Sequence, residues 1–276
     1  MVADQGEPLA RIADALERLV PLELRDVDWT SAPAFAGRDS RFRPIARIDA
    51  LPLDRLKGID RQKQAVVENV ARLARGFAAH DMLLWGARGM GKSALVRAAV
   101  AADQAANPRR LALIQVDAPS IGRLPELFEA LGAINRQFLL YLDDLAFDHG
   151  GEDVLRYLRS ALDGGLAARP GNIRLAVTSN HRAILSRDTD DQAGPLHDRD
   201  RMDDTLALAD RFGLRLGFHP CDQAEYLAIV EAHARPLGLH WSDDDALEWS
   251  RARGPLSGRS AWQFVVEIAG RAGKSL

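Results

Sequence analysis

The chain has 276 residues, of which 47% are hydrophobic and 27% charged, and its formal net charge is -3. No apolar run approaches the roughly 18 residues of a membrane span, and the balance of 36 basic and 39 acidic residues gives no overall attraction to nucleic acid or anionic lipid. The N-terminal segment lacks the apolar stretch of a signal peptide, and Cys221 is the single cysteine, which excludes a disulfide framework. We therefore expect a globular, cytoplasmic protein without a membrane span.

The first 50 residues are predicted to form a helix followed by an extended arm. Residues 8–23 carry apolar side chains at helical spacing, which predicts an amphipathic helix. Residues 26–47 are rich in Pro, Ala, Arg and aromatic residues without clear periodicity. We interpret them as an arm that packs on the main body or on a neighbouring subunit.

Three arginines of this arm, Arg41, Arg43 and Arg47, are interleaved with Phe42 and Pro44. Such a pattern is compatible with nucleic-acid binding, with contact to a neighbouring subunit, or with contact to an acidic segment of the same chain. Because the chain as a whole is mildly acidic, nucleic acid is not the favoured partner.

From residue 51 onward, short apolar runs alternate with amphipathic helical patterns, which is typical of a parallel sheet with helical crossovers. Five buried strands are predicted, at Met82–Trp85, Leu111–Val116, Phe138–Leu142, Ile173–Thr178 and Leu214–Phe218. Helical patterns lie between them at 61–78, 92–105, 123–132 and 152–167. Residues 187–204 contain seven aspartates and three arginines, which predicts a solvated loop. The predicted fold is therefore an α/β unit over residues 51–220, a five-stranded parallel sheet with flanking helices.

After Pro220 the strand patterns stop. Three helical patterns follow, at 222–236, 243–252 and 258–272. They predict a small C-terminal helical subdomain over residues 221–276.

A glycine-rich segment, Gly86-Ala-Arg-Gly-Met-Gly-Lys92-Ser93, follows the first predicted strand and precedes a helix. It matches G-x-x-x-x-G-K-[ST], in which backbone N–H groups converge on phosphate oxygens, the lysine reaches the β- and γ-phosphates, and the serine hydroxyl binds Mg²⁺. The predicted cofactors are therefore ATP and Mg²⁺. The predicted phosphate contacts are Gly86, Ala87, Arg88, Gly89, Met90, Gly91, Lys92, Ser93 and Ala94.

Polar residues follow two later strands. The third predicted strand ends directly in Asp143 and Asp144, and we predict that Asp143 holds Mg²⁺ through a water while Asp144 acts as the base for the attacking water. The alternative is a pair of acids that cap a helix. The fourth strand ends at Asn180, which would project toward the γ-phosphate if that strand lies between the first and the third.

Taken together, these motifs resemble those of AAA+ ATPases over residues 51–276. Lys57-Gly58-Ile59-Asp60 resembles the segment that commonly contacts adenine, so the resemblance implies base contacts at Gly58 and Ile59. Leu208-Ala-Asp-Arg211-Phe-Gly resembles the arginine-finger box, which implies that Arg211 acts on the ATP of a neighbouring subunit. Gly258-Arg259-Ser resembles the second sensor motif.

More narrowly, the runs GARGMGKSALVRA, YLDDLAF and LADRFGLRLGFHPCDQAEYLAIV are similar to a bacterial AAA+ family catalogued as domain of unknown function 815. The resemblance implies ATP binding and no established client. Two functions remain open: an oligomeric ATPase that remodels or loads a macromolecular partner, and a slow ATP-dependent assembly switch like replication initiators and helicase loaders.

Overall fold

The structure is a computed structural model that describes residues 24–38, 41–145, 152–163, 169–180 and 207–276. The helix predicted at 8–23 and the acidic loop predicted at 187–204 lie outside these residues.

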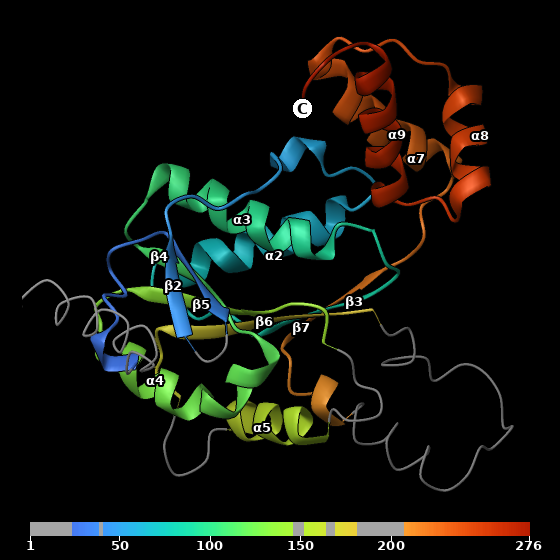
Figure 1. Ribbon diagram of the computed structural model, residues 1–276. Coiled ribbons are helices and arrows are strands. Elements are labelled where there is room, and N and C mark those ends of the chain that lie inside the picture. The colour runs from blue at the N-terminus through green and yellow to red at the C-terminus, as the bar shows by residue number, and fades with distance from the viewer. Residues whose placement is uncertain (1–23, 39–40, 146–151, 164–168, 181–206) are drawn as a thin grey trace, which may run out of the picture.

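A single sheet of seven strands forms the centre of the described chain, in the order β2-β1-β4-β5-β6-β3-β7 (Figure 1). Its strands are β1 (Ala34–Arg38), β2 (Arg41–Ile45), β3 (Met82–Gly86), β4 (Leu111–Gln115), β5 (Gln137–Leu142), β6 (Ile173–Ser179) and β7 (Leu214–Phe218). All neighbouring pairs are parallel except β1 and β2, which form an antiparallel pair at one edge. The predicted parallel sheet is thus confirmed, and β6 lies between β5 and β3, as the interpretation of Asn180 requires.

The prediction of five strands was wrong, because the arm contributes two more. In β1 and β2, Phe35 and Phe42 are buried and pack around the ring of Trp29. Sequence patterning missed this hairpin because β2 exposes most of its side chains and contains Pro44. A proline is tolerated there because β2 is an edge strand, where one N–H is not needed for the ladder.

In the residues described, the arm packs on the main body of its own chain, which is one of the two arrangements expected for it. The buried guanidinium of Arg136, which precedes β5, donates hydrogen bonds to the carbonyls of Trp29 and Ala32, both at 2.8 Å. The Trp29 indole in turn donates to the Leu24 carbonyl at 3.0 Å. These contacts fix the arm against the end of the sheet.

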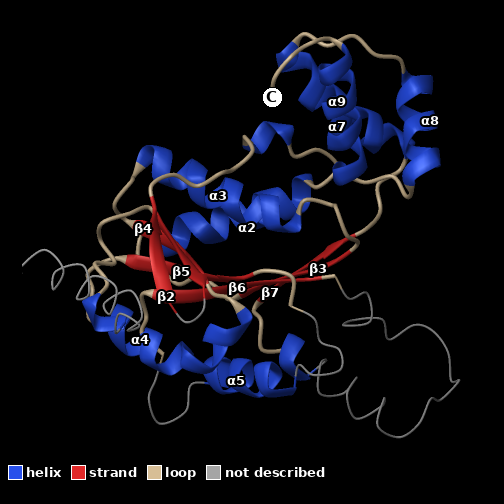
Figure 2. Cartoon of the chain, viewed as in Figure 1, coloured by secondary structure: helices blue, strands red, loops and turns tan. Residues whose placement is uncertain are grey.

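Helices cover both faces of the sheet in three layers (Figure 2). The α-helices are α2 (Asp60–Ala74), α3 (Lys92–Ala106), α4 (Leu124–Gly132), α5 (Glu152–Asp163), α7 (Gln223–Ala234), α8 (Asp243–Arg253) and α9 (Gly258–Arg271). Short 3-10 helices lie at Leu24–Asp26, Leu53–Arg55, Ala118–Arg123 and Arg235–Leu237. Helices α2 and α3 pack on one face, and α4 and α5 on the other, each through its own apolar cluster.

The helices α7, α8 and α9 pack on one another at the C-terminal end of the chain (Figure 1). Capping boxes at Asp222 and Ser257 start α7 and α9. Between the helices, the Tyr226 hydroxyl donates to the Ala246 carbonyl, and the Phe264 ring lies against Trp249. Among the described residues, no helix is both long and apolar enough to cross a bilayer.

Candidate functional site

The glycine-rich loop joins β3 to α3 in a backbone conformation that residues with a Cβ atom rarely adopt. Gly86 has a φ of +118°, and a Cβ at this position would lie 2.2 Å from the Phe218 carbonyl oxygen of β7. Gly89 has a φ of +76°, and its Cβ would lie 3.0 Å from the Cβ of Arg259. The close approach of β7 and of α9 to the loop is therefore possible only with glycine at both positions.

Lys92 is the first residue of α3, and its side chain is 5% exposed. Its ammonium donates to the carbonyls of Gly86 and Ala87, both at 2.8 Å, and to Oδ1 of Asn180 at 2.9 Å. Burial lowers the pKa of Lys92 from its usual 10.5 to about 8, and the carboxylates of Asp144 and Asp143 limit the decrease. The loop thus encloses a cation whose hydrogen bonds all go to neutral oxygens.

This lowered pKa predicts that ATP affinity decreases as the pH rises through about 8. Below that pH the free protein already carries the ammonium that attracts phosphate, and above it binding must take up a proton, so affinity should fall by up to about tenfold per pH unit. Titrations with a fluorescent ATP analogue between about pH 7 and pH 9.5 measure this slope. The Lys92→Arg variant, which stays charged throughout, should show none. A flat profile in the wild-type protein would contradict the lowered pKa of Lys92.

The two acids at the end of β5 lie beside the loop. The Ser93 hydroxyl donates to Oδ1 of Asp143 at 2.6 Å, and the Thr178 hydroxyl donates to the same oxygen at 2.7 Å. Partial burial opposes the charged form of Asp143, but the surrounding hydroxyls, Ser93 first and then Tyr141 and Thr178, outweigh it, and the pKa of this carboxyl is lowered. Asp143 is therefore a carboxylate whose oxygen adjoins the Ser93 hydroxyl.

Asp144 occupies a left-handed backbone conformation, with a φ of +53°. Its N–H donates to the Thr178 hydroxyl at 2.8 Å, and its carboxylate accepts a hydrogen bond from the Asn180 side-chain amide. Since the same amide accepts from Lys92 through its oxygen, Asn180 bridges the loop lysine and the second acid.

These groups line one pocket of about 620 Å³ between the loop, the ends of β5 and β6, and the helices α7 and α9. The predicted site residues that line it are Ile59, Gly89, Met90, Gly91, Lys92, Ser93, Ala94, Asp143, Asp144, Asn180 and Arg259. Five predicted site residues do not line it: Gly58, Gly86, Ala87, Arg88 and Arg211. Gly86 and Ala87 act from outside through their carbonyls, Arg88 is exposed, and Gly58 lies against Glu225 of α7.

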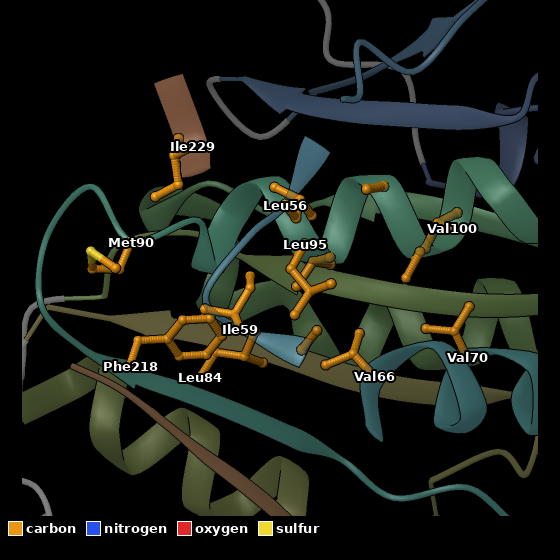
Figure 3. Packing of buried hydrophobic residues seen from close by; sticks show 14 of the residues in the cluster. Leu56, Ile59, Val66, Val70, Leu84, Met90, Leu95, Val100, Phe218 and Ile229 are labelled. Atoms are coloured by element: carbon orange, nitrogen blue, oxygen red, sulfur yellow. The ribbon is translucent and has the colours of Figure 1, made fainter. Parts of the chain in front are cut away.

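One wall of the pocket is apolar, although Arg55, Lys57 and His233 also line the pocket. Leu56 and Ile59, which precede α2, belong to the same buried cluster as Met90 of the loop and Ile229 of α7 (Figure 3). Sequence reasoning missed Ile229, although it points from the C-terminal helices to this cluster. The wall is of the kind that accommodates the flat face of a base.

Arg259 stands at the start of α9, directly over the loop. Its backbone N–H donates to the Gly89 carbonyl at 3.2 Å, and its side chain lines the pocket. The C-terminal helices therefore contact the glycine-rich loop itself.

Arg211 precedes β7 and lies near the ends of the strands that are opposite to the glycine-rich loop. Leu214 pairs with Met82, whereas Phe218 pairs with Gly86, so the start of β7 is far from the loop at the end of β3. The Arg211 guanidinium forms an ion pair with Asp163 of α5 and donates to the Ala207 carbonyl. The structure therefore does not bring Arg211 together with the pocket of its own chain.

The residues present fit a magnesium nucleotide. The Ser93 and Asp143 oxygens form the hard oxygen donor set that Mg²⁺ prefers, and Lys92 supplies positive charge beside the loop. The apolar wall and the volume of about 620 Å³ suit a base and a ribose.

A parallel sheet with this loop after β3, an acid pair after β5 and a helical bundle above the loop is the fold of AAA+ P-loop proteins. Within that class, the chain belongs to the family described as "Protein of unknown function (DUF815)", which matches residues 29–272. No curated protein matches the sequence.

Solved structures agree in fold. The Orc1 protein of Aeropyrum pernix in complex with DNA is 19% identical, with a TM-score of 0.55 over 79% of this chain and 61% of that chain. A mutant of Thermotoga maritima RuvB is 18% identical, with a TM-score of 0.53 over 81% of this chain and 67% of that one. Domain III of the Thermotoga maritima replication initiation protein DnaA is 14% identical, with a TM-score of 0.52 over 82% and 91%. This chain thus spans about two thirds of the length of the first two.

Proposed function

We propose that this protein binds ATP with Mg²⁺, hydrolyses it to ADP and phosphate, and uses the cycle to remodel or load a macromolecular partner in the cytoplasm. The observation that carries the proposal is the cluster at the loop, where the Ser93 hydroxyl and the Asp143 carboxylate meet beside the buried Lys92. The fold supports ATPase activity of the AAA+ type at a coarser level.

Each group has a role set by its chemistry. Lys92 and the loop N–H groups hold the phosphates, Ser93 and Asp143 hold Mg²⁺, and Mg²⁺ when bound neutralises phosphate charge. Asp144 accepts the proton of the attacking water, and Asn180 orients that water. Arg259 couples the nucleotide to the C-terminal helices. We propose that residues 221–276 form a lid on the nucleotide-binding unit, which comprises residues 51–220. This proposal is supported by the contact between α9 and Gly89.

We further propose that ATP-bound subunits form a homo-oligomer in which Arg211 reaches the nucleotide of a neighbour. A guanidinium is always charged and donates in a rigid fork, which suits the charge that develops on a transferring phosphoryl group. The position of Arg211, at the opposite end of the sheet from its own loop, supports action between subunits. Its ion pair with Asp163 is the competing interpretation, in which Arg211 is only structural.

Mixing two inactive variants tests this arrangement. Arg211→Ala alone and Lys92→Ala alone should each be nearly inactive in hydrolysis. Mixed, they should recover part of the activity, because some interfaces combine an intact loop with an intact Arg211. Steady-state phosphate release measures the recovery, and analytical sizing confirms that the variants assemble together.

Asp163→Asn provides the control, since it removes the ion pair but leaves both proposed catalytic groups. If Arg211 acts between subunits, this variant keeps most of its activity. Absence of recovery in a confirmed mixed assembly, or a wild type that stays monomeric with ATP at high concentration, would overturn the trans role of Arg211.

A further inference from the structure

Thr178 lies at the centre of the acid pair, although no sequence motif singles it out. It belongs to β6, next to β5, and is 1% exposed. Its hydroxyl accepts the N–H of Asp144 at 2.8 Å and donates to Oδ1 of Asp143 at 2.7 Å. Its backbone carbonyl also accepts the N–H of Leu145 at 2.9 Å. One residue thus contacts three consecutive residues after β5.

The direction of these hydrogen bonds follows from their chemistry. A backbone N–H can only donate, so the Thr178 oxygen must accept from Asp144. The single hydroxyl proton is then available for Asp143, whose carboxylate accepts it. The Thr178 hydroxyl oxygen therefore holds the Asp144 backbone and hydrogen-bonds to the Asp143 carboxylate at the same time.

The backbone at Asp144 needs such a restraint. A φ of +53° is uncommon for a residue with a side chain, and outside regular structure its N–H has no ladder partner. With the Thr178 hydroxyl in place, the Asp144 carboxylate is directed at the Asn180 amide, which also contacts Lys92. The geometry of the second acid thus depends on a hydroxyl from β6, whose residue also lines the pocket.

Burial alone does not require a threonine here. Valine has nearly the same shape, favours strands equally and lacks only the hydroxyl. A position that served packing alone would be satisfied by either residue. The two hydrogen bonds are what distinguishes Thr178.

We propose that Thr178 is a positioning residue that sets both acids at once: it orients Asp143 toward Mg²⁺ and holds Asp144 in the conformation from which it accepts a proton. This inference rests on the proposed ATPase function. It assigns the role to the hydroxyl rather than to the shape of the side chain.

The matched variants Thr178→Val and Thr178→Ser separate the two. In the nucleotide-free protein, residue-resolved hydrogen exchange should show the Asp144 amide exchanging at least about tenfold faster in Thr178→Val, the scale of one lost hydrogen bond. The Leu145 amide, bonded to the Thr178 backbone, should stay unchanged and serves as the internal control. Thr178→Ser should exchange like the wild type.

With nucleotide, Thr178→Val should lower kcat about tenfold or more and raise the Mg²⁺ concentration for half-maximal activity by a similar factor. ATP affinity measured without Mg²⁺ should stay within about twofold, because Lys92 and the loop are untouched. Thr178→Ser should recover both parameters to within about threefold. Melting temperatures confirm that the variants are folded.

Wild-type exchange and Mg²⁺ dependence in Thr178→Val would overturn the proposal, as would a Thr178→Ser variant as defective as Thr178→Val. A wild-type protein that hydrolyses no ATP would instead refute the proposed function. The exchange comparison, which uses no nucleotide, would then still decide whether the Thr178 hydroxyl holds Asp144.

Discussion

The Lys92→Ala variant is expected to lose ATP binding by about a hundredfold or more while it remains folded. Hydrogen bonds to charged groups contribute about 1.5–3 kcal/mol each, and the ammonium is the side-chain charge that the structure encloses beside the loop. Burying this cation costs free energy, and that cost lowers the pKa of Lys92 to about 8. Removing the ammonium also removes this cost. Alanine is a good helix former at the first residue of α3, so the loss of three hydrogen bonds to neutral oxygens should not unfold the chain.

Titration with a fluorescent ATP analogue measures the affinity, and thermal unfolding measures stability. Arg72→Ala is the matched control, because it removes one positive charge from an exposed ion pair on α2, away from the pocket. Its ATP affinity should equal that of the wild type. An unchanged affinity in Lys92→Ala would refute the phosphate-binding assignment of the loop.

The Asp144→Asn variant should bind ATP like the wild type and hydrolyse it about a hundredfold more slowly or worse, the scale of a lost general base. Asparagine keeps the size of the side chain and an oxygen that can still accept from the Asn180 amide, so the arrangement of the site should survive. What it lacks is an oxygen that can accept a proton. Steady-state phosphate release and ATP binding, measured on the same preparation, check both parts.

Asp143→Asn is the comparison variant for the same experiment. It should weaken Mg²⁺ binding, since the Asp143 carboxylate accepts a hydrogen bond from the Ser93 hydroxyl, the other proposed Mg²⁺ ligand. If Asp144→Asn hydrolyses ATP normally while Asp143→Asn is inactive, Asp144 only shapes the backbone after β5.

The central sheet was predictable because strands buried on both faces leave long apolar runs. Each of the runs at β3, β4, β5, β6 and β7 ends within two residues of its prediction. The β1–β2 hairpin was not predictable in this way. Its burial comes from Trp29 and from the distant Arg136, and no local pattern carries such a contact.

The same distinction between local patterns and distant contacts holds for the residues of the candidate site. The loop was readable because its glycines and lysine are spaced locally along the chain. Thr178 was not, because a threonine in a strand is ordinary and its role arises only where β6 lies beside β5. The partner of Arg211 was equally hidden, since Asp163 is 48 positions away in the sequence. Contacts set by strand order and helix packing need the folded chain.

Hydrolysis of ATP at this loop is tested most directly by a single-turnover reaction. An excess of protein over ATP with Mg²⁺ is incubated, and the nucleotide bound to the protein is then identified. The proposed function predicts ADP on the wild-type protein and intact ATP on Asp144→Asn. Intact ATP bound to both proteins would contradict it and would favour an assembly switch that binds ATP without turning it over.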